Sequence, residues 1–445
     1  MSRVNSKLAN GSEALIPSSY NLAEVKLTPS NGEVRDITDL CAQISIRESI
    51  YAGSLQCDIN ILDAANVLEK LKVVSGEVLD LLITRRLADG QSDKYSHTFR
   101  ISEVSSYAKL KPGTQTYVLK CISEHAYMSQ LKTISKPFSD VPGALIQKMC
   151  TDELKINPEE LSINTETKQT ITGVYPRMRP MYLINWLTRR SYDNGSPFFF
   201  YETLGHGIHF DSYENMINKK YPDENGNEKS FFNEYMHAPF MNTTVGSPEN
   251  IKQLKNKILK IATDLNMSKY IDAANGAYSS TLHTLDIATK TYEKTTYEYG
   301  KDLMLNKNGV LPNKLLFDDR AIESHRESTN FYVSLNTSAA GGGSNYHAPN
   351  DTDILTANAY IENMDGTVLT INIYGDFKLS VGMVISCNVM KSVDNAESER
   401  GKDKYLSGKY LVTSINHRFE DEYIMEVLLK KDSYIESLDK IEKVK

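Results

Sequence analysis

The sequence predicts a mainly β protein of the α+β class, with two similar small antiparallel β-barrels, a small α-rich domain and an inserted α/β segment. Short runs of β-branched and aromatic residues alternate with turn residues near both ends of the chain, as in small barrels. Apolar residues at helical spacing gather in the middle. The two β-rich regions also share landmarks in the same order.

Length and composition limit the functional classes. The chain has 445 residues, which suits several domains, and 40% hydrophobic with 24% charged residues is the balance of a folded, soluble protein. The net charge of −7 disfavours a general nucleic-acid binder, because such proteins neutralise phosphates with basic residues. No apolar run reaches the ~18 residues of a membrane-spanning helix, and residues 1–20, which lack a secretory h-region, are interpreted as a polar tail.

The cysteines predict neither a disulfide framework nor a zinc site, because they are odd in number and scattered. Most lie in apolar runs, where cysteine acts as a small hydrophobe. We expect synthesis in the reducing cytoplasm of a host and no cofactor. The five are Cys41, Cys57, Cys121, Cys150 and Cys387.

Residues 21–125 are predicted to form the first barrel, followed by a small helical domain at 126–194. The barrel strands are expected at 42–46, 55–62, 78–83, 99–104 and 116–122. A short helix at 63–71 begins at Asp63, whose carboxylate can cap it. In the helical domain, Pro142 and Pro180 each start a helix.

The second barrel is predicted from residues 195–240 together with 320–435, and residues 436–445 form a tail. Its strands are expected at 198–203, 208–213, 357–361, 367–373, 383–389, 410–419 and 423–429. Residues 336–351 contain a Gly-Gly-Gly-Ser run and are predicted to form a flexible loop.

Residues 241–319 are predicted to form the insertion. Ser247 and Pro248 make a strong helix start, and Thr/Tyr-rich strands are expected at 281–299. Apolar residues follow the helix start at spacings of three and four: Ile251, Leu254, Ile258, Ile261 and Leu265. This stripe either packs on its own chain or joins three copies as a coiled coil, although two heptads are marginal alone.

An internal repeat links the two β-rich regions. The landmarks Gly76, Phe99 and Tyr117 of the first correspond to Gly382, Tyr410 and Tyr423 of the second, in the same order and over the same length of chain. If one chain carries two similar barrels, three chains around an axis present six similar units. That arrangement matches a sixfold partner to a threefold one.

Three stretches carry a family resemblance. They are 179–191 (RPMYLINWLTRRS) with 195–202 (GSPFFFYE) and 207–212 (GIHFDS), then 382–385 (GMVI), then 407–419 (SGKYLVTSINHRF) leading into 423–430. In this order they look like the baseplate central hub protein of T-even-type phages and its relatives in other contractile tails. The likeness extends over about residues 20–435, and the insertion has no counterpart that we can assign.

The resemblance implies a homotrimer with two tube-like barrels per chain, located in the virion at the tail baseplate. Its ring would continue the tail tube protein above, seat the spike protein below and contact other baseplate proteins. The genome would pass through the ring without specific binding. We expect a neutral or acidic channel, since basic walls would hold each phosphate.

Two apparent metal sites are better interpreted as turns. His206 and His209 flank Gly207 at a hairpin turn, not on one face of a helix. Residues 223–228, with Glu234, imitate a calcium loop, but Glu228 stands where that loop needs glycine. We therefore predict no metal site.

One basic-aromatic cluster is a candidate interface. Its arginines are Arg177, Arg179, Arg189 and Arg190, and its rings are Tyr175, Tyr182 and Trp186. In one interpretation the arginines bind phosphate and the rings stack on bases. In the favoured one the rings lie in the core and the arginines pair with carboxylates at a subunit contact.

The sequence thus favours a structural hub that is not an enzyme. None of the catalytic motifs for hydrolases, nucleotide-binding or metalloprotease chemistry is present. Three alternatives remain: a tail-associated cell-wall hydrolase, a glycan-binding tail adhesin, and the hub of a bacterial contractile injection system. The hydrolase would need an acid/base carboxylate pair, which 57 acidic residues do not single out.

Overall fold

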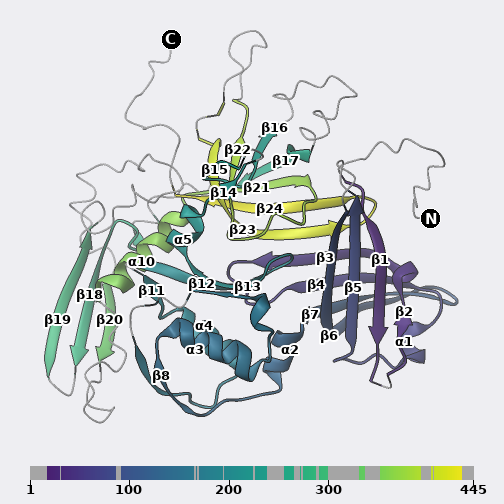
Figure 1. Cartoon of the computed structure of the whole chain (residues 1–445), viewed down its shortest axis with the longest axis horizontal. Helices are drawn as coiled ribbons and strands as arrows, with labels where there is room; N and C mark the ends of the chain where they lie inside the picture. The colour runs from purple at the N-terminus through teal and green to yellow at the C-terminus, as the bar shows by residue number, and fades with distance from the viewer. Residues whose placement is uncertain are drawn as a thin grey trace, which may run out of the picture.

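The computed structural model describes residues 18–30, 32–86, 92–164, 167, 170–193, 195–223, 226–237, 255–264, 271, 274–286, 290–298, 330–335, 351–391, 402–403 and 405–432. Figure 1 shows the first barrel at the right, the second above and to its left, a mixed module in the lower part of the view beside the first barrel, and a small outer sheet at the left with a helix against it. Within these ranges, no helix has the length and apolarity to cross a membrane.

The first barrel arranges its six main strands in the order β1-β5-β6-β7-β4-β3, with antiparallel neighbours. Between β1 and β3 the turn η1 (Thr38–Leu40) bridges the gap, because Ile37 N–H donates to Val25 O at 2.9 Å and Thr38 Oγ1 accepts from Val25 N–H at 2.7 Å. The five expected strands are present and β1 is additional. The elements are β1 (Asn21–Thr28), β2 (Arg35–Asp36), β3 (Cys41–Ser49), β4 (Gln56–Asp63), α1 (Val67–Lys70), β5 (Val78–Arg86), β6 (Ser92–Lys111), β7 (Thr114–Ser123) and α2 (Glu124–Gln130).

The second barrel is closed. Its strand order is β16-β22-β23-β24-β21-β17, and β17 pairs back onto β16. It differs from the expected antiparallel barrel at one strand, because β16 runs parallel to both β17 and β22. The strands are β16 (Glu234–His237), β17 (Lys257–Asp264), β21 (Thr367–Tyr374), β22 (Val384–Asn388), β23 (Gly408–Phe419) and β24 (Tyr423–Lys431).

The two barrels have the same topology. Taken in chain order, β1, β3, β4, β5, β6 and β7 correspond to β16, β17, β21, β22, β23 and β24, and corresponding strands have corresponding neighbours. Two features depart from this match: β16 runs parallel to β22, and β16 pairs with β17 whereas β1 and β3 are joined only through η1. The predicted relation between the two β-rich regions is therefore confirmed at the level of strand connectivity.

The glycine landmarks occupy equivalent positions. Gly76 and Gly382 both have left-handed φ angles, +94° and +79°. Gly76 N–H donates to Ile101 O at 2.8 Å, and Gly382 N–H donates to Val412 O at 2.9 Å. Each glycine thus lies just before the first strand of a three-stranded meander and makes the same hydrogen bond to the second strand. Its backbone conformation is one that favours glycine.

The cross-strand partners agree as well. Phe99 lies opposite Leu79 in the first barrel, and Tyr410 lies opposite Ile385 in the second. All four side chains are buried. Because Leu79 and Ile385 each follow the landmark glycine by three residues, the two meanders share one register.

Two β-bulges are also repeated. The register of β6 on β7 shifts between Ile101 and Glu103, and that of β23 on β24 shifts between Val412 and Ser414. A second pair of shifts occurs on β3 and β17, at Cys41/Gln43 and Ile258/Lys260, opposite Ile61 and Ile373 respectively. Bulges are local insertions that bend a strand, so their repetition is more specific than alternation alone.

The third landmark pair is wrong by two residues. Counted from the bulges, Glu103 opposite Lys120 corresponds to Ser414 opposite Leu428. Tyr117 therefore corresponds to Met425, not to Tyr423. A shift of two keeps every side chain on the same face of a strand, so alternation could not detect the error.

The module below the barrels combines helices with small sheets. Its own core contains Ile146, Leu183 and Phe210. The helices expected after Pro142 and Pro180 are present. The elements are β8 (Pro137–Asp140), α3 (Pro142–Lys148), the π-helical turn η2 (Met149–Glu153), η3 (Pro158–Glu160), β9 (Leu161–Ile163), β10 (Ile171–Val174), α4 (Pro180–Thr188), β11 (Tyr192–Asp193), β12 (Ser196–Thr203), β13 (Gly207–Ser212), α5 (Tyr213–Asn218), β14 (Tyr221–Pro222) and β15 (Glu228–Lys229).

Strands β12 and β13 do not belong to the second barrel, contrary to the predicted 195–240 segment. They pair with β9 and β11 in a four-stranded sheet. All eight residues of β12 are buried, because alternate side chains enter different cores. Phe198 and Phe200 pack in the lower module, whereas Phe199 and Tyr201 pack with the barrels.

The outer sheet consists of β18 (Ser279–Asp286), β19 (Thr291–Glu298) and β20 (Asn330–Leu335), which agrees with the strands expected near 281–299. Helix α10 (Asp351–Met364) lies against it (Figure 1). The expected strand at 357–361 is therefore wrong. Leu355, Ala359 and Asn363 are buried at helical spacing, which a five-residue window conceals.

The expected helix at 251–265 is also wrong over its described part, where β17 supplies a strand to the second barrel. Ile258 is buried and Ile261 packs against the same core. The bulge between Ile258 and Lys260 adds one residue, so a spacing of three brings both isoleucines to one face of a strand and imitates helical periodicity. Ile251, Leu254 and Leu265 lie outside the described residues, as does the expected loop at 336–350.

Candidate assembly interface

The two barrels of one chain are joined through a continuous strand pairing. The second half of β23 pairs antiparallel with β3 over six residue pairs, from Ser414 opposite Ser49 to Phe419 opposite Ile44. Side chains add to this seam, since Ser45 Oγ donates to Asn416 Oδ1 at 2.7 Å and Ser414 Oγ donates to Glu48 O at 3.1 Å. The thirteen-stranded sheet thereby runs through both barrels.

A buried polar network lies within the seam. Glu48 Oε1 lies 3.3 Å from His417 Nε2, and neither side chain is exposed. His417 Nδ1 lies 2.8 Å from the Tyr423 hydroxyl, and Leu204 N–H donates to Glu48 Oε2 at 2.8 Å. Burial raises the pKa of Tyr423 far above its ordinary value, so its hydroxyl stays protonated. The His417 ring thus lies between this neutral hydroxyl at Nδ1 and the Glu48 carboxyl group at Nε2.

Further contacts fix the barrels near this seam. The Arg85 guanidinium on β5 donates to Gly375 O after β21. Within the second barrel, Lys255 Nζ pairs with Asp376 Oδ2 at 2.9 Å beside this contact. The start of the described chain also reaches the second barrel, because Tyr423 N–H donates to Ser18 O at 2.9 Å. The barrels are therefore held as one rigid pair.

The arginine cluster is exposed on the lower module. Arg177, Arg179, Arg189 and Arg190 all face solvent. Among the described residues no carboxylate lies within ion-pair distance of any of them, and the pairing expected at a subunit contact stays a prediction. Arg179 donates to Gln130 Oε1, and the Arg190 guanidinium lies 4.2 Å from the centre of the Trp186 ring.

The aromatic part of that prediction is partly correct. Tyr175 is buried and stacks on Phe138, and Trp186 packs against the core of the lower module. Tyr182, by contrast, is 61% exposed. Arg179, Tyr182 and Arg189 border a groove of about 790 Å³ between α4, α10 and β12. Arginine and aromatic side chains are enriched in protein–protein contacts, so this groove is a candidate contact surface.

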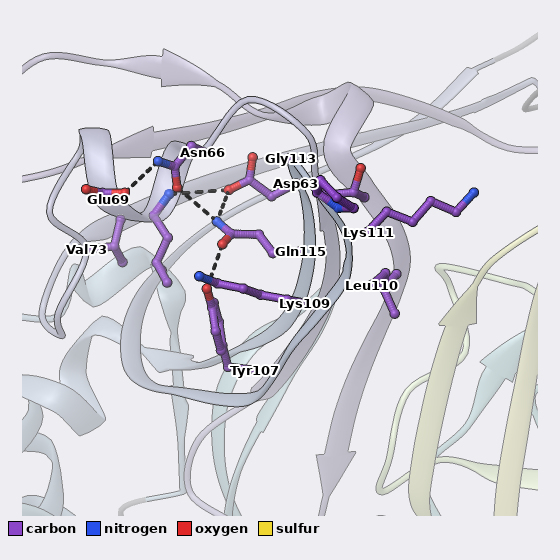
Figure 2. A pocket seen from close by; sticks show the side chains of 13 residues that line it. Asp63, Asn66, Glu69, Val73, Tyr107, Lys109, Leu110, Lys111, Gly113 and Gln115 are labelled. Atoms are coloured by element: carbon purple, nitrogen blue, oxygen red, sulfur yellow. Dashed lines mark hydrogen bonds between the residues drawn. The ribbon is translucent and has the colours of Figure 1, made fainter.

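A second hollow, beside α1, has a structural explanation (Figure 2). The carboxylate of Asp63 accepts hydrogen bonds from Gln115 and from the backbone amides of Ala65, Val67 and Leu68. Burial opposes its ionisation, but these donors outweigh burial and keep its pKa below the ordinary value. The expected N-cap is therefore wrong: Asn66 holds that position and α1 begins at Val67, while the Asp63 side chain accepts from the first amides of the helix, so its oxygens are already occupied.

The side chains that could bind a metal include His206, His209 and the five cysteines. His206 and His209 lie at the β12–β13 turn and on β13, and Tyr201 stacks on the His209 ring at 5.3 Å. No group of three or more metal-ligating side chains gathers within the described ranges. All five cysteines are free and buried, and burial raises the thiol pKa of Cys150 and Cys387 to about 12.

Comparison with known proteins places this architecture. No protein-family model matches the sequence, and no curated protein matches it. Among solved structures, the 43 kDa tail protein of prophage MuSo2 from Shewanella oneidensis superposes with a TM-score of 0.52 at 11% identity, covering 94% of this chain and 100% of that one. The chain has the fold of a phage tail protein.

Two more distant neighbours have related descriptions. A tail protein from Neisseria meningitidis MC58 has a TM-score of 0.47 at 10% identity, over 93% of this chain and 97% of that one. An E. coli type VI secretion component, described as similar to phage T4 tail proteins, has a TM-score of 0.39 at 8% identity, over 88% of this chain and 73% of that one.

The buried pair of the seam was not found from the sequence. Glu48 and His417 are 369 residues apart, and no local motif links them. A usable signal exists, however. Glu48 continues the inward-facing series of Ile44 and Ile46, and His417 stands between inward-facing Ile415 and Phe419. A charged or polar residue at an inward position of a strand indicates a buried partner.

Proposed function

We propose that three copies of this chain form the baseplate hub of a contractile tail, which joins a sixfold tube to a threefold spike. One observation carries the proposal: the chain contains two barrels with the same strand order, the same meander register and the same two bulges. Three such chains supply six equivalent positions around an axis. The fold shared with the prophage tail protein supports the setting.

The continuous strand pairing at the seam supports a structural role. Barrels connected by one strand pairing of six residue pairs and a buried Glu48–His417 contact keep one spacing and one angle. A ring that continues a tube needs that constancy, whereas a flexible linker would let the six positions differ. Tube and spike proteins, other baseplate proteins and passing DNA are the proposed partners, within a virion.

The expected acidic channel belongs to this proposal. With a net charge of −7, the chain can present a lumen that does not hold phosphates. A structure of the assembled ring tests this directly. A lumen lined mainly by lysine and arginine would contradict passage of a genome.

The mass of the purified chain in solution tests the hub. We expect a stable species of three times 50.1 kDa by sedimentation equilibrium. A monomer that binds glycans would instead support an adhesin. Incubation with peptidoglycan tests the further proposal that the chain is not an enzyme, since release of soluble fragments would establish a hydrolase. Transported cargo would distinguish an injection-system hub from a phage hub.

A further inference from the structure

The seam inside one chain specifies a second seam between chains. In the first barrel the seam uses β3, and in the second it uses β23. The structural equivalent of β3 in the second barrel is β17, and the equivalent of β23 in the first barrel is β6. Within each chain, the edges of β3 and β23 are already paired with each other. The equivalent edges of β17 and β6 have no such pairing in the described structure.

β6 stops pairing with β5 at the position equivalent to the one where β23 leaves β22 and begins to pair with β3. β23 leaves β22 near Val412 and pairs with β3 from Ser414 onward. β6 pairs with β5 as far as Arg100, and next to this pair Ile101 N–H donates a hydrogen bond to Glu77 O. From residue 103 to 111, within the described chain, β6 has a strand neighbour on its β7 side alone.

This β6 edge has features of a contact surface. Tyr107 is 49% exposed and Leu110 is 56% exposed along it. The hydroxyl of Ser105 is shielded from solvent and has no hydrogen-bond partner among the described residues. An exposed, partly apolar strand edge is a ready template for another strand, and proteins usually cover such an edge.

The β17 edge is described over four of the six matching positions, residues 261–264. Lys257 and Ile258 pair with β16, but residues 260–264 pair with β21 alone in the described structure. From the repeated bulge, Ile261 corresponds to Ile44, the residue at which the seam pairing of β3 ends. Ala262 is exposed and Thr263 is half-buried.

We propose that β17 of one copy pairs antiparallel with residues 103–111 of β6 in the next copy, repeating the β3–β23 seam. The inference rests on the proposed ring and names the surfaces that close it. Two different surfaces meet at this contact, so the association is head-to-tail, and in the proposed ring it closes after three chains. Every barrel then has the same two neighbours, and all six seams are alike.

The internal seam also gives the register. Arg418 lies opposite Ser45, and these positions correspond to Ala108 and Ala262. Similarly, Asn416 opposite Arg47 translates to Ser105 opposite Asp264. An extra residue bulges from β6 between these two pairs, where Ser106 has a φ of +53°.

Disulfide trapping tests the proposal in the full-length chain. Residues directly opposite in antiparallel strands have Cα atoms about 4.5–5.5 Å apart, within the range that a disulfide spans. The double variant Ala108→Cys with Ala262→Cys should form covalent dimers and trimers on oxidation, lost on reduction. Each single variant should stay monomeric on a denaturing gel, because the five native cysteines are buried. Both alanines are exposed, so neither change disturbs the core.

A matched pair tests the register, and the mass of the unmodified chain separates the two proposals. Leu110→Cys with Ala262→Cys, displaced by two residues on the same strand, should cross-link at least tenfold less than the aligned pair. A trimeric mass without cross-linking of the aligned pair would overturn the strand pairing and leave the ring intact. A monomeric mass without cross-linking would overturn both.

Discussion

Glu48 on β3 and His417 on β23 meet at 3.3 Å in the interior of the seam, with neither side chain exposed. Because the carboxylate also accepts from the Leu204 amide, one residue connects both barrels and the lower module. Its removal would leave two buried polar groups without this partner.

We therefore expect Glu48→Ala to lower the free energy of unfolding by about 3 kcal/mol or more, and Glu48→Gln to cost less because it keeps one acceptor. Urea denaturation measures both. Glu24→Ala is the control, since its pair with Lys26 is open to solvent and should contribute little to stability. Equal effects of Glu48→Ala and Glu24→Ala would show that the seam network does not stabilise the fold.

Substitution of Gly382 should be far more damaging than substitution of Gly113. Both glycines have positive φ, +79° and +82°, so alanine incurs a similar backbone cost of about 1–2 kcal/mol at either. At Gly382 an added Cβ would also clash with the Tyr201 hydroxyl and lie 3.2 Å from the Met216 sulfur, whereas at Gly113 it meets nothing within 4 Å. The difference in unfolding free energy between Gly382→Ala and Gly113→Ala should exceed about 1 kcal/mol. Denaturation midpoints that agree would contradict the close packing at the start of β22.

Stability should depend on pH through His209. Burial, assisted by Lys219 and His206, lowers the pKa of His209 from 6.5 to about 4. Between these values the unfolded chain binds the proton more readily, so the histidine's contribution is complete above pH 6.5 and is lost as pH falls toward 4. Relative to His209→Gln, the native chain should lose roughly 3 kcal/mol over that window. A pH-independent difference between the two proteins would refute this assignment.

The contact of Arg190 with Trp186 offers a spectroscopic test. The chain contains one tryptophan, so its fluorescence reports on this site alone. Arg190→Ala should shift the emission and cost about 0.5–1 kcal/mol, because a cation over an indole face stabilises it by that amount at exposed sites. Arg189→Ala, on the neighbouring exposed position, should leave the emission unchanged.

Strand alternation predicted most of both barrels, because each strand faces a core on one side. It failed where spacing was ambiguous. The bulge before Lys260 made a strand look helical, and a two-residue slip between Tyr117 and Met425 left the pattern of faces intact. The Glu48–His417 contact joins distant segments, so periodicity alone could not reveal it.

The central claim is that one chain provides two equivalent positions in a ring of three. Electron micrographs of the purified particle, viewed along its axis, test it most directly. We predict end-on averages with threefold symmetry and six similar lobes around an open centre. An average with three lobes, or particles without a ring, would contradict it.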